Sequence, residues 1–166
     1  MFKTMKPQVW AFDAEWIPDP ATGRAVYGFA DDIDETDVID AMFERGGATE
    51  QEPRPYLKTI LCRVVSVSVV TRAEEKDEVR LQLTSLPAAD AAGTQALPEA
   101  ELIQRFLEGV GRTQPQLVGY NSGGADLRIL LQRGVALGVQ AADFARRPGK
   151  PWEGVDYFLP NGDWHV

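Results

Sequence analysis

Two acidic side chains one residue apart, Asp13 and Glu15, end an apolar run in the stretch VWAFDAEWIPD (residues 9–19). Successive side chains of a β-strand point to opposite faces, so these two share one face, with their Cα atoms about 6.5 to 7 Å apart. Carboxylates this close repel each other, and a divalent cation between them would relieve the repulsion. The stretch predicts a metal-binding strand or, as the simpler alternative, a hydrated strand end before a proline-rich turn.

A third acid, Asp126, lies in a second segment whose side chains could take part in chemistry, LVGYNSGGADLRILLQRG (residues 117–134). We predict a buried strand that ends at Asn121, a tight turn through Ser122, Gly123 and Gly124, and a helix with Asp126 in its first turn, facing the strand ends. On its own, a carboxylate there stabilises a helix by about 0.3 to 1 kcal/mol. The glycines do not form a phosphate-binding pattern, which disfavours a nucleotide cradle.

The elements that must position these acids follow from hydrophobic periodicity. A first strand is predicted near residues 8–16, and residues 17–58, rich in proline and glycine, read as an insertion with one helix in DETDVIDAMFERGG (34–47). The remaining predicted elements are strands at 59–70 and 78–86 joined by the charged turn TRAEEKDE (71–78), a helix at 97–110, a strand at 115–120 and a helix at 125–138. This order predicts an α/β fold, a mixed sheet with flanking helices.

Composition favours one soluble domain spanning residues 1–166, with 44% hydrophobic residues. The net charge of −8, from 25 acidic and 17 basic residues, argues against a broad positive surface for duplex nucleic acid. The single cysteine, Cys62, lies in an apolar run, which predicts a buried thiol in a reducing cytoplasm. The N-terminus is too short and too polar for a signal peptide. No apolar run is long enough to predict a membrane span.

The motifs FDAEW and GYNSGGADLRILL together resemble the first and second motifs of the DEDD-type 3′ to 5′ exonucleases. Within that superfamily the chain looks most like the predicted exonucleases related to the proofreading domain of family B DNA polymerases. Their long insertion after the first motif is similar to residues 17–58, so the resemblance covers nearly the whole chain. It implies an RNase H-like fold and hydrolysis of single-stranded DNA or RNA from the 3′ end with two Mg²⁺ or Mn²⁺ ions.

The resemblance also implies roles for individual residues. By motif match the catalytic metal ligands are Asp13, Glu15 and Asp126, and the residues beside the bound strand are Asn121, Ala14 and Trp16. Hard carboxylate oxygens suit Mg²⁺ and Mn²⁺, in agreement with this assignment. Bound cations would also reverse the local negative charge that otherwise opposes a polyanionic substrate.

Two features depart from the family pattern. Ala125 stands where an aromatic residue usually precedes the second-motif aspartate. The third motif, with a fourth aspartate and a nearby Tyr or His as general base, is absent, and the ending NGDWHV (161–166) reads as the start of a strand. We therefore expect an incomplete domain with little nuclease activity of its own and an exposed apolar sheet face. His165, Asp143 and Asp156 are not assigned to the site.

Two other functions compete with the exonuclease assignment. A non-catalytic nucleic-acid-binding or interaction module on the same fold is the main alternative, because a fold does not determine a function. A phosphatase with Asp13 as nucleophile is disfavoured, because Glu15 stands where that signature has a second aspartate.

Overall fold

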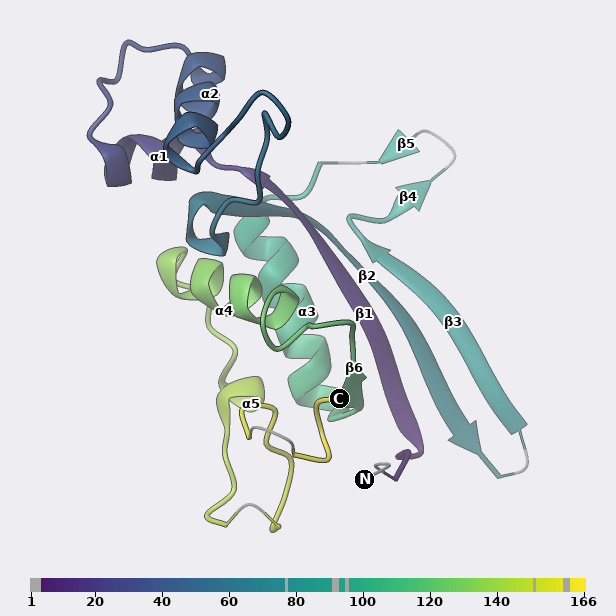
Figure 1. Cartoon of the computed structure of the whole chain (residues 1–166). Coiled ribbons are helices and arrows are strands. Elements are labelled where there is room, and N and C mark those ends of the chain that lie inside the picture. The colour runs from purple at the N-terminus through teal and green to yellow at the C-terminus, as the bar shows by residue number, and fades with distance from the viewer. Residues whose placement is uncertain (1–3, 77, 91–92, 95, 151, 160–161) are drawn as a thin grey trace.

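A four-stranded sheet with the order β3-β2-β1-β6 forms the centre of the computed structural model (Figure 1). The structure describes residues 4–76, 78–90, 93–94, 96–150, 152–159 and 162–166. The strands are β1 (Gln8–Pro18), β2 (Cys62–Glu75), β3 (Glu78–Leu86) and β6 (Gln116–Val118). β2 is antiparallel to both β1 and β3, whereas β6 is parallel to β1. The predicted mixed α/β sheet is confirmed, and its arrangement is RNase H-like.

Along the chain, the helices lie between and after these strands. They are α1 (Pro20–Tyr27), α2 (Glu35–Arg45), a short 3-10 helix (Thr59–Leu61), α3 (Glu99–Thr113), α4 (Asp126–Ala136) and α5 (Ala142–Ala145), with a small hairpin of β4 (Ala89–Asp90) and β5 (Gly93–Thr94). The helices predicted at 34–47, 97–110 and 125–138 are confirmed as α2, α3 and α4. In the part of the chain that the structure describes, no helix combines the length and apolarity needed to cross a bilayer.

Helix α1 was not predicted, because Pro18 and Pro20, one on each side of Asp19, indicated a turn. Proline is nevertheless well suited to the first helical position, where its missing N–H costs nothing and its fixed φ matches the helix. Pro20 occupies this position, and Gly28 ends the helix in the left-handed conformation, with φ 70°.

Helices α3 and α4 cover one face of the sheet (Figure 1). The apolar stripe predicted on α3 is buried there, as Leu102, Ile103, Phe106, Leu107 and Val110. From β1, Phe12 and Ala14 enter the same core, whereas Asp13 and Glu15 are exposed. The period of two in β1 therefore sends the apolar side chains toward the helices and the acids toward the opposite, open face.

The open face of the sheet carries apolar side chains outside the core. Val70 of β2 is paired with Leu83 of β3, and both are exposed, as are Val79 and Leu81. This agrees with the expected exposed apolar sheet face. Asp13 lies on the same face, opposite Ser68 of β2.

Residues 164–166 continue the sheet beyond β6. Leu117 N–H donates to the Trp164 carbonyl at 2.8 Å, and Val166 N–H donates to the Leu117 carbonyl at 2.9 Å. The bridge between Leu117 and His165 is parallel. Of the strand predicted in NGDWHV, the structure shows a single parallel bridge, at His165.

Several predicted boundaries are wrong. The strand predicted from residue 59 begins at Cys62, because Thr59–Leu61 form the 3-10 helix. β2 runs to Glu75, so most of the predicted charged turn is strand, and Lys76 with φ 57° marks its tip. Glu74, Glu75 and Lys76 stay exposed there, and Arg72 forms an ion pair with Glu74, so these charges do not oppose strand pairing. β6 ends at Val118 rather than Asn121, because the chain must leave the sheet earlier to start α4.

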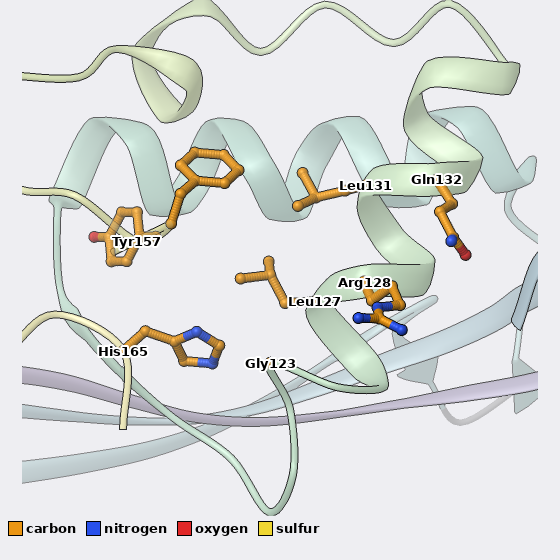
Figure 2. Close-up of a pocket in the computed structure, with 8 residues that line it drawn as sticks. Gly123, Leu127, Arg128, Leu131, Gln132, Tyr157 and His165 are labelled. Atoms are coloured by element: carbon orange, nitrogen blue, oxygen red, sulfur yellow. The ribbon is translucent and has the colours of Figure 1, made fainter. Parts of the chain in front are cut away.

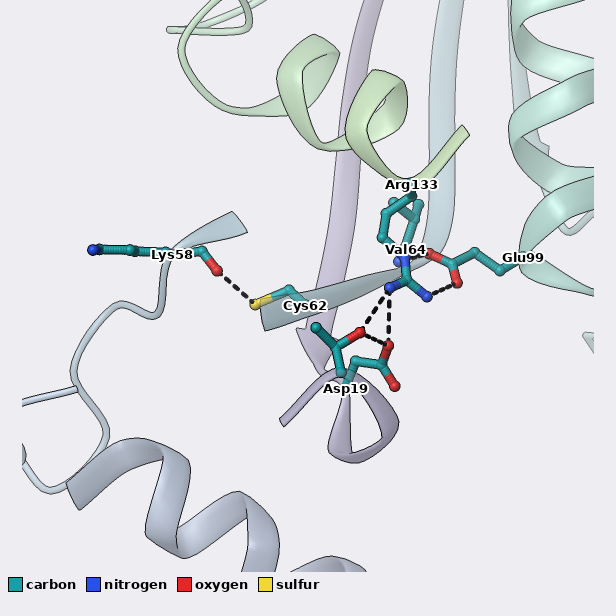
Figure 3. A network of polar contacts seen from close by, with 7 residues as sticks. Asp19, Lys58, Cys62, Val64, Glu99 and Arg133 are labelled. Carbon is teal, nitrogen blue, oxygen red and sulfur yellow. Dashed lines mark hydrogen bonds and ion pairs between the residues drawn. The ribbon is translucent and has the colours of Figure 1, made fainter. Parts of the chain in front are cut away.

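A buried ion-pair network joins the insertion to the helical layer (Figure 3). The Arg133 guanidinium of α4 donates to Asp19 Oδ2 at 2.9 Å and to Glu99 Oε2 at 2.6 Å. Glu99, at the start of α3, also accepts the Val64 N–H at 2.7 Å. Arg133 therefore fixes α4 against α1 and α3, and Glu99 joins α3 to β2.

The single cysteine is predicted to be unreactive in the folded protein. Cys62 is 3% exposed, and burial, reinforced by the Asp19 carboxylate, raises the pKa of its thiol to about 11. Because the thiolate is the reactive species, we expect a disulfide reagent near neutral pH to label the native protein much more slowly than the protein unfolded in guanidinium chloride. Equal labelling rates would contradict this environment.

The same shift has a consequence for stability. A folded state that disfavours the thiolate contributes its stability below the ordinary pKa of 9.0, and this contribution is lost as the pH rises toward about 11. A Cys62→Ala variant should lose less stability than the parent chain over that interval, which pH-dependent urea unfolding measures.

Candidate active site

The two acids of β1 lie next to each other on the open face of the sheet. Asp13 is opposite Ser68 and Glu15 is opposite Ser66, and both acids are exposed. Among the described residues, neither carboxylate has a hydrogen bond or ion pair. Asp13 also lines a shallow groove of about 390 Å³ that Tyr120 borders. The oxygens of both carboxylates are therefore available to a ligand.

Asp126 reaches the same segment from a distant part of the chain. It is the first residue of α4 and only 4% exposed, and its Oδ1 accepts the backbone N–H of Ala14 at 2.9 Å. β6 pairs with β1 only over Val9–Ala11, so this edge of β1 loses its strand partner beyond that point. Asp126 supplies the missing acceptor, because a buried N–H left without one is costly. The carboxylate thus contacts the residue between the two acids of β1.

The three carboxylates do not form a ready-made ligand set. Within the described residues, no three His, Cys, Asp or Glu side chains are grouped so that they could hold a metal ion. Asp13 and Glu15 point to the open face, whereas Asp126 is buried and bonded to the edge of β1. Binding one ion to all three acids would require their side chains to rotate.

The three residues expected beside the substrate have different environments. Ala14 is buried, with its methyl in the core, so only its backbone N–H takes part in the site. Trp16 is half-buried against the core and follows a register shift in β1. Asn121 is exposed, with φ 51°, and a Cβ on Gly124 would lie 2.7 Å from its Oδ1. Glycine at 124 therefore lets the amide of Asn121 fold over the turn.

Two further residues near the start of α4 were not predicted from the sequence. Arg128 is exposed and lines a pocket of about 460 Å³ between α4 and the segment that carries Tyr157, as Figure 2 shows. Tyr56, from the insertion, is 67% exposed. Partial burial raises the pKa of its phenol, Cys62 and Asp126 raise it further, and Arg128 lowers it. A lone tyrosine in a loop and one arginine in a helix give no sequence pattern, so no signal identified them.

Residues 54–166 match a family described as predicted 3′-5′ exonucleases related to the exonuclease domain of PolB. The chain belongs to this exonuclease family. The match includes Asn121 and Asp126 but begins after β1, so it covers less of the chain than the resemblance did and leaves out Asp13 and Glu15. No curated protein matches the chain.

Proposed function

We propose that this protein is a metal-dependent 3′ to 5′ exonuclease that hydrolyses single-stranded DNA or RNA. One observation carries the proposal: the hydrogen bond from Ala14 N–H to Asp126 Oδ1. It joins the part of the chain that matches the family to β1, the segment outside the match that holds Asp13 and Glu15. Two acidic motifs separated by more than half the chain thus lie at one place.

The donor set fits Mg²⁺ or Mn²⁺. Asp13, Glu15 and Asp126 would hold the ions, because carboxylate oxygens are the ligands these cations prefer. When bound, the ions would activate a water molecule and stabilise charge on the scissile phosphate. In the part of the chain that the structure describes, Asp13 and Glu15 form no ion pair that would have to break for this role.

Neighbouring side chains would position the nucleic acid. The exposed guanidinium of Arg128 suits a phosphate group, because its planar donors can bind two phosphate oxygens. The exposed ring of Tyr56 offers a surface on which a base can stack. Asn121 adds an amide with both donor and acceptor atoms at the tip of the turn.

The test is a strand-shortening assay with the protein at its natural full length. Oligonucleotides of DNA and of RNA, labelled at the 5′ end, are incubated with Mg²⁺, with Mn²⁺ or with a chelator. We expect a ladder of products shortened from the 3′ end, and no products with the chelator. Internal cleavage, or shortening that persists with the chelator, would contradict the proposal.

The second candidate is a non-catalytic nucleic-acid-binding module. It is favoured by the lack of a preformed three-acid cluster among the described residues. In the same experiment this module would bind the labelled strand without shortening it, at any metal concentration. A gel-shift measurement alongside the cleavage assay separates the two functions.

A further inference from the structure

A short hydrogen bond connects the turn before α4 to the C-terminal segment, residues 164–166. Ser122 Oγ lies 2.7 Å from His165 Nε2, although the two residues are far apart in the sequence. Ser122 is only 2% exposed, and its hydroxyl also donates to the Gly119 carbonyl at 3.2 Å. The histidine tautomer decides which of the two atoms donates the proton of the Ser122–His165 bond. A serine this buried is not accessible as a nucleophile, so the contact calls for another explanation.

The turn that Ser122 belongs to leads directly to Asp126. The Ser122 carbonyl accepts the Leu127 N–H at 2.8 Å, and the Asn121 carbonyl accepts the Ala125 N–H at 3.0 Å. A Cβ on Gly119 would lie 2.6 Å from the Cβ of Ser122, so glycine lets the turn close onto the end of β6. Displacing Ser122 would therefore displace the first turn of α4 and its carboxylate.

Backbone hydrogen bonds of its neighbours and a contact of its own ring hold His165 in place. Backbone hydrogen bonds of Leu117 with Trp164 and Val166 hold this segment against β6. The imidazole lies 6.3 Å, centroid to centroid, from the ring of Phe12, the residue before Asp13. His165 thus bridges β1, the sheet edge and the turn.

We propose that His165 is a positioning residue for the candidate active site: through Ser122 it holds the turn that presents Asn121 and directs Asp126 at the N–H of Ala14. The inference rests on the proposed function for its catalytic consequence. Its structural consequence, the placement of Asp126, does not depend on that function. Loss of the imidazole should loosen the Asp126 contact and leave the sheet intact.

The test compares His165→Ala, Ser122→Ala and the double variant with His165→Gln, whose amide can still donate to Ser122. Tyr157→Phe is the matched control, because it removes another buried hydrogen bond of the C-terminal region, from Tyr157 to the Pro115 carbonyl at 2.7 Å, without touching the turn. The measurements are amide hydrogen exchange at Ala14, Mn²⁺ affinity by electron paramagnetic resonance, and kcat and KM for strand shortening by the full-length protein.

Each alanine variant should speed exchange at Ala14, weaken Mn²⁺ binding by about 10- to 100-fold and lower kcat by a similar factor, with little change in KM. The double variant should lose clearly less than the sum of the two single losses, because the two substitutions share the Ser122–His165 contact. His165→Gln should recover most of the loss, and Tyr157→Phe should change thermal stability alone. Unchanged exchange at Ala14 and unchanged Mn²⁺ affinity in His165→Ala would overturn the positioning role.

The failure of this inference is distinguishable from failure of the proposed function. If the parent protein shortens no strand but His165→Ala still speeds exchange at Ala14, the positioning of Asp126 stands and the exonuclease proposal fails. If the parent protein is an active exonuclease and His165→Ala matches it in all measurements, the exonuclease proposal stands and the positioning role is wrong.

Discussion

Asp13→Asn is expected to lower kcat for strand shortening by about 100- to 1,000-fold and to leave the free energy of unfolding unchanged or slightly increased. The carboxylate is exposed and has no hydrogen bond or ion pair among the described residues, so the fold does not depend on it. Removing its charge also relieves repulsion with Glu15. Steady-state kinetics on a 5′-labelled strand and urea unfolding measure the two effects.

Asp126 should respond differently, because it has a structural as well as a proposed catalytic role. Asp126→Ala removes the acceptor of a buried backbone N–H, so we expect a loss of about 1 to 3 kcal/mol of stability together with the loss of activity. Asp40→Asn, at an exposed acid of α2, is the control and should change neither quantity. Full activity in Asp13→Asn would show that this first-motif carboxylate takes no part in the reaction.

Arg133→Met should have the largest effect on stability, a loss of about 3 to 5 kcal/mol. The substitution leaves the Asp19 and Glu99 carboxylates buried without their cation, at a junction of α1, α3 and α4 (Figure 3). Desolvated charges without a partner are far more costly than the loss of a surface pair. Chemical unfolding followed by circular dichroism gives the free-energy difference.

The control for this prediction is Arg105→Met on the same helical layer. Arg105 forms an ion pair with Glu101 one turn away on α3, but both side chains are about half exposed. Such a pair contributes little, so a change within about 0.5 kcal/mol is expected. Equal effects of the two substitutions would show that water reaches the Arg133 network.

Local pattern determined the elements of this protein and much of their orientation. The alternation in β1 predicted that Asp13 and Glu15 share one face, and the structure places Phe12 and Ala14 on the other, in the core. The helical spacing of α3 predicted its buried stripe. These predictions succeed because periodicity depends only on backbone geometry within one element. Element boundaries were less predictable, as the ends of β2 and β6 show, because they depend on where a partner strand stops.

The candidate site itself was decided by tertiary structure. The motif aspartate was identifiable from sequence, but its contact with Ala14 exists because β6 is too short to pair with the rest of β1. In the same way, Arg133 meets Asp19 and Glu99, and Ser122 meets His165, only after the helices and the C-terminal segment pack on the sheet. Such contacts join residues far apart in the sequence, and no local periodicity encodes them. They form because buried polar groups must find partners within the packed chain.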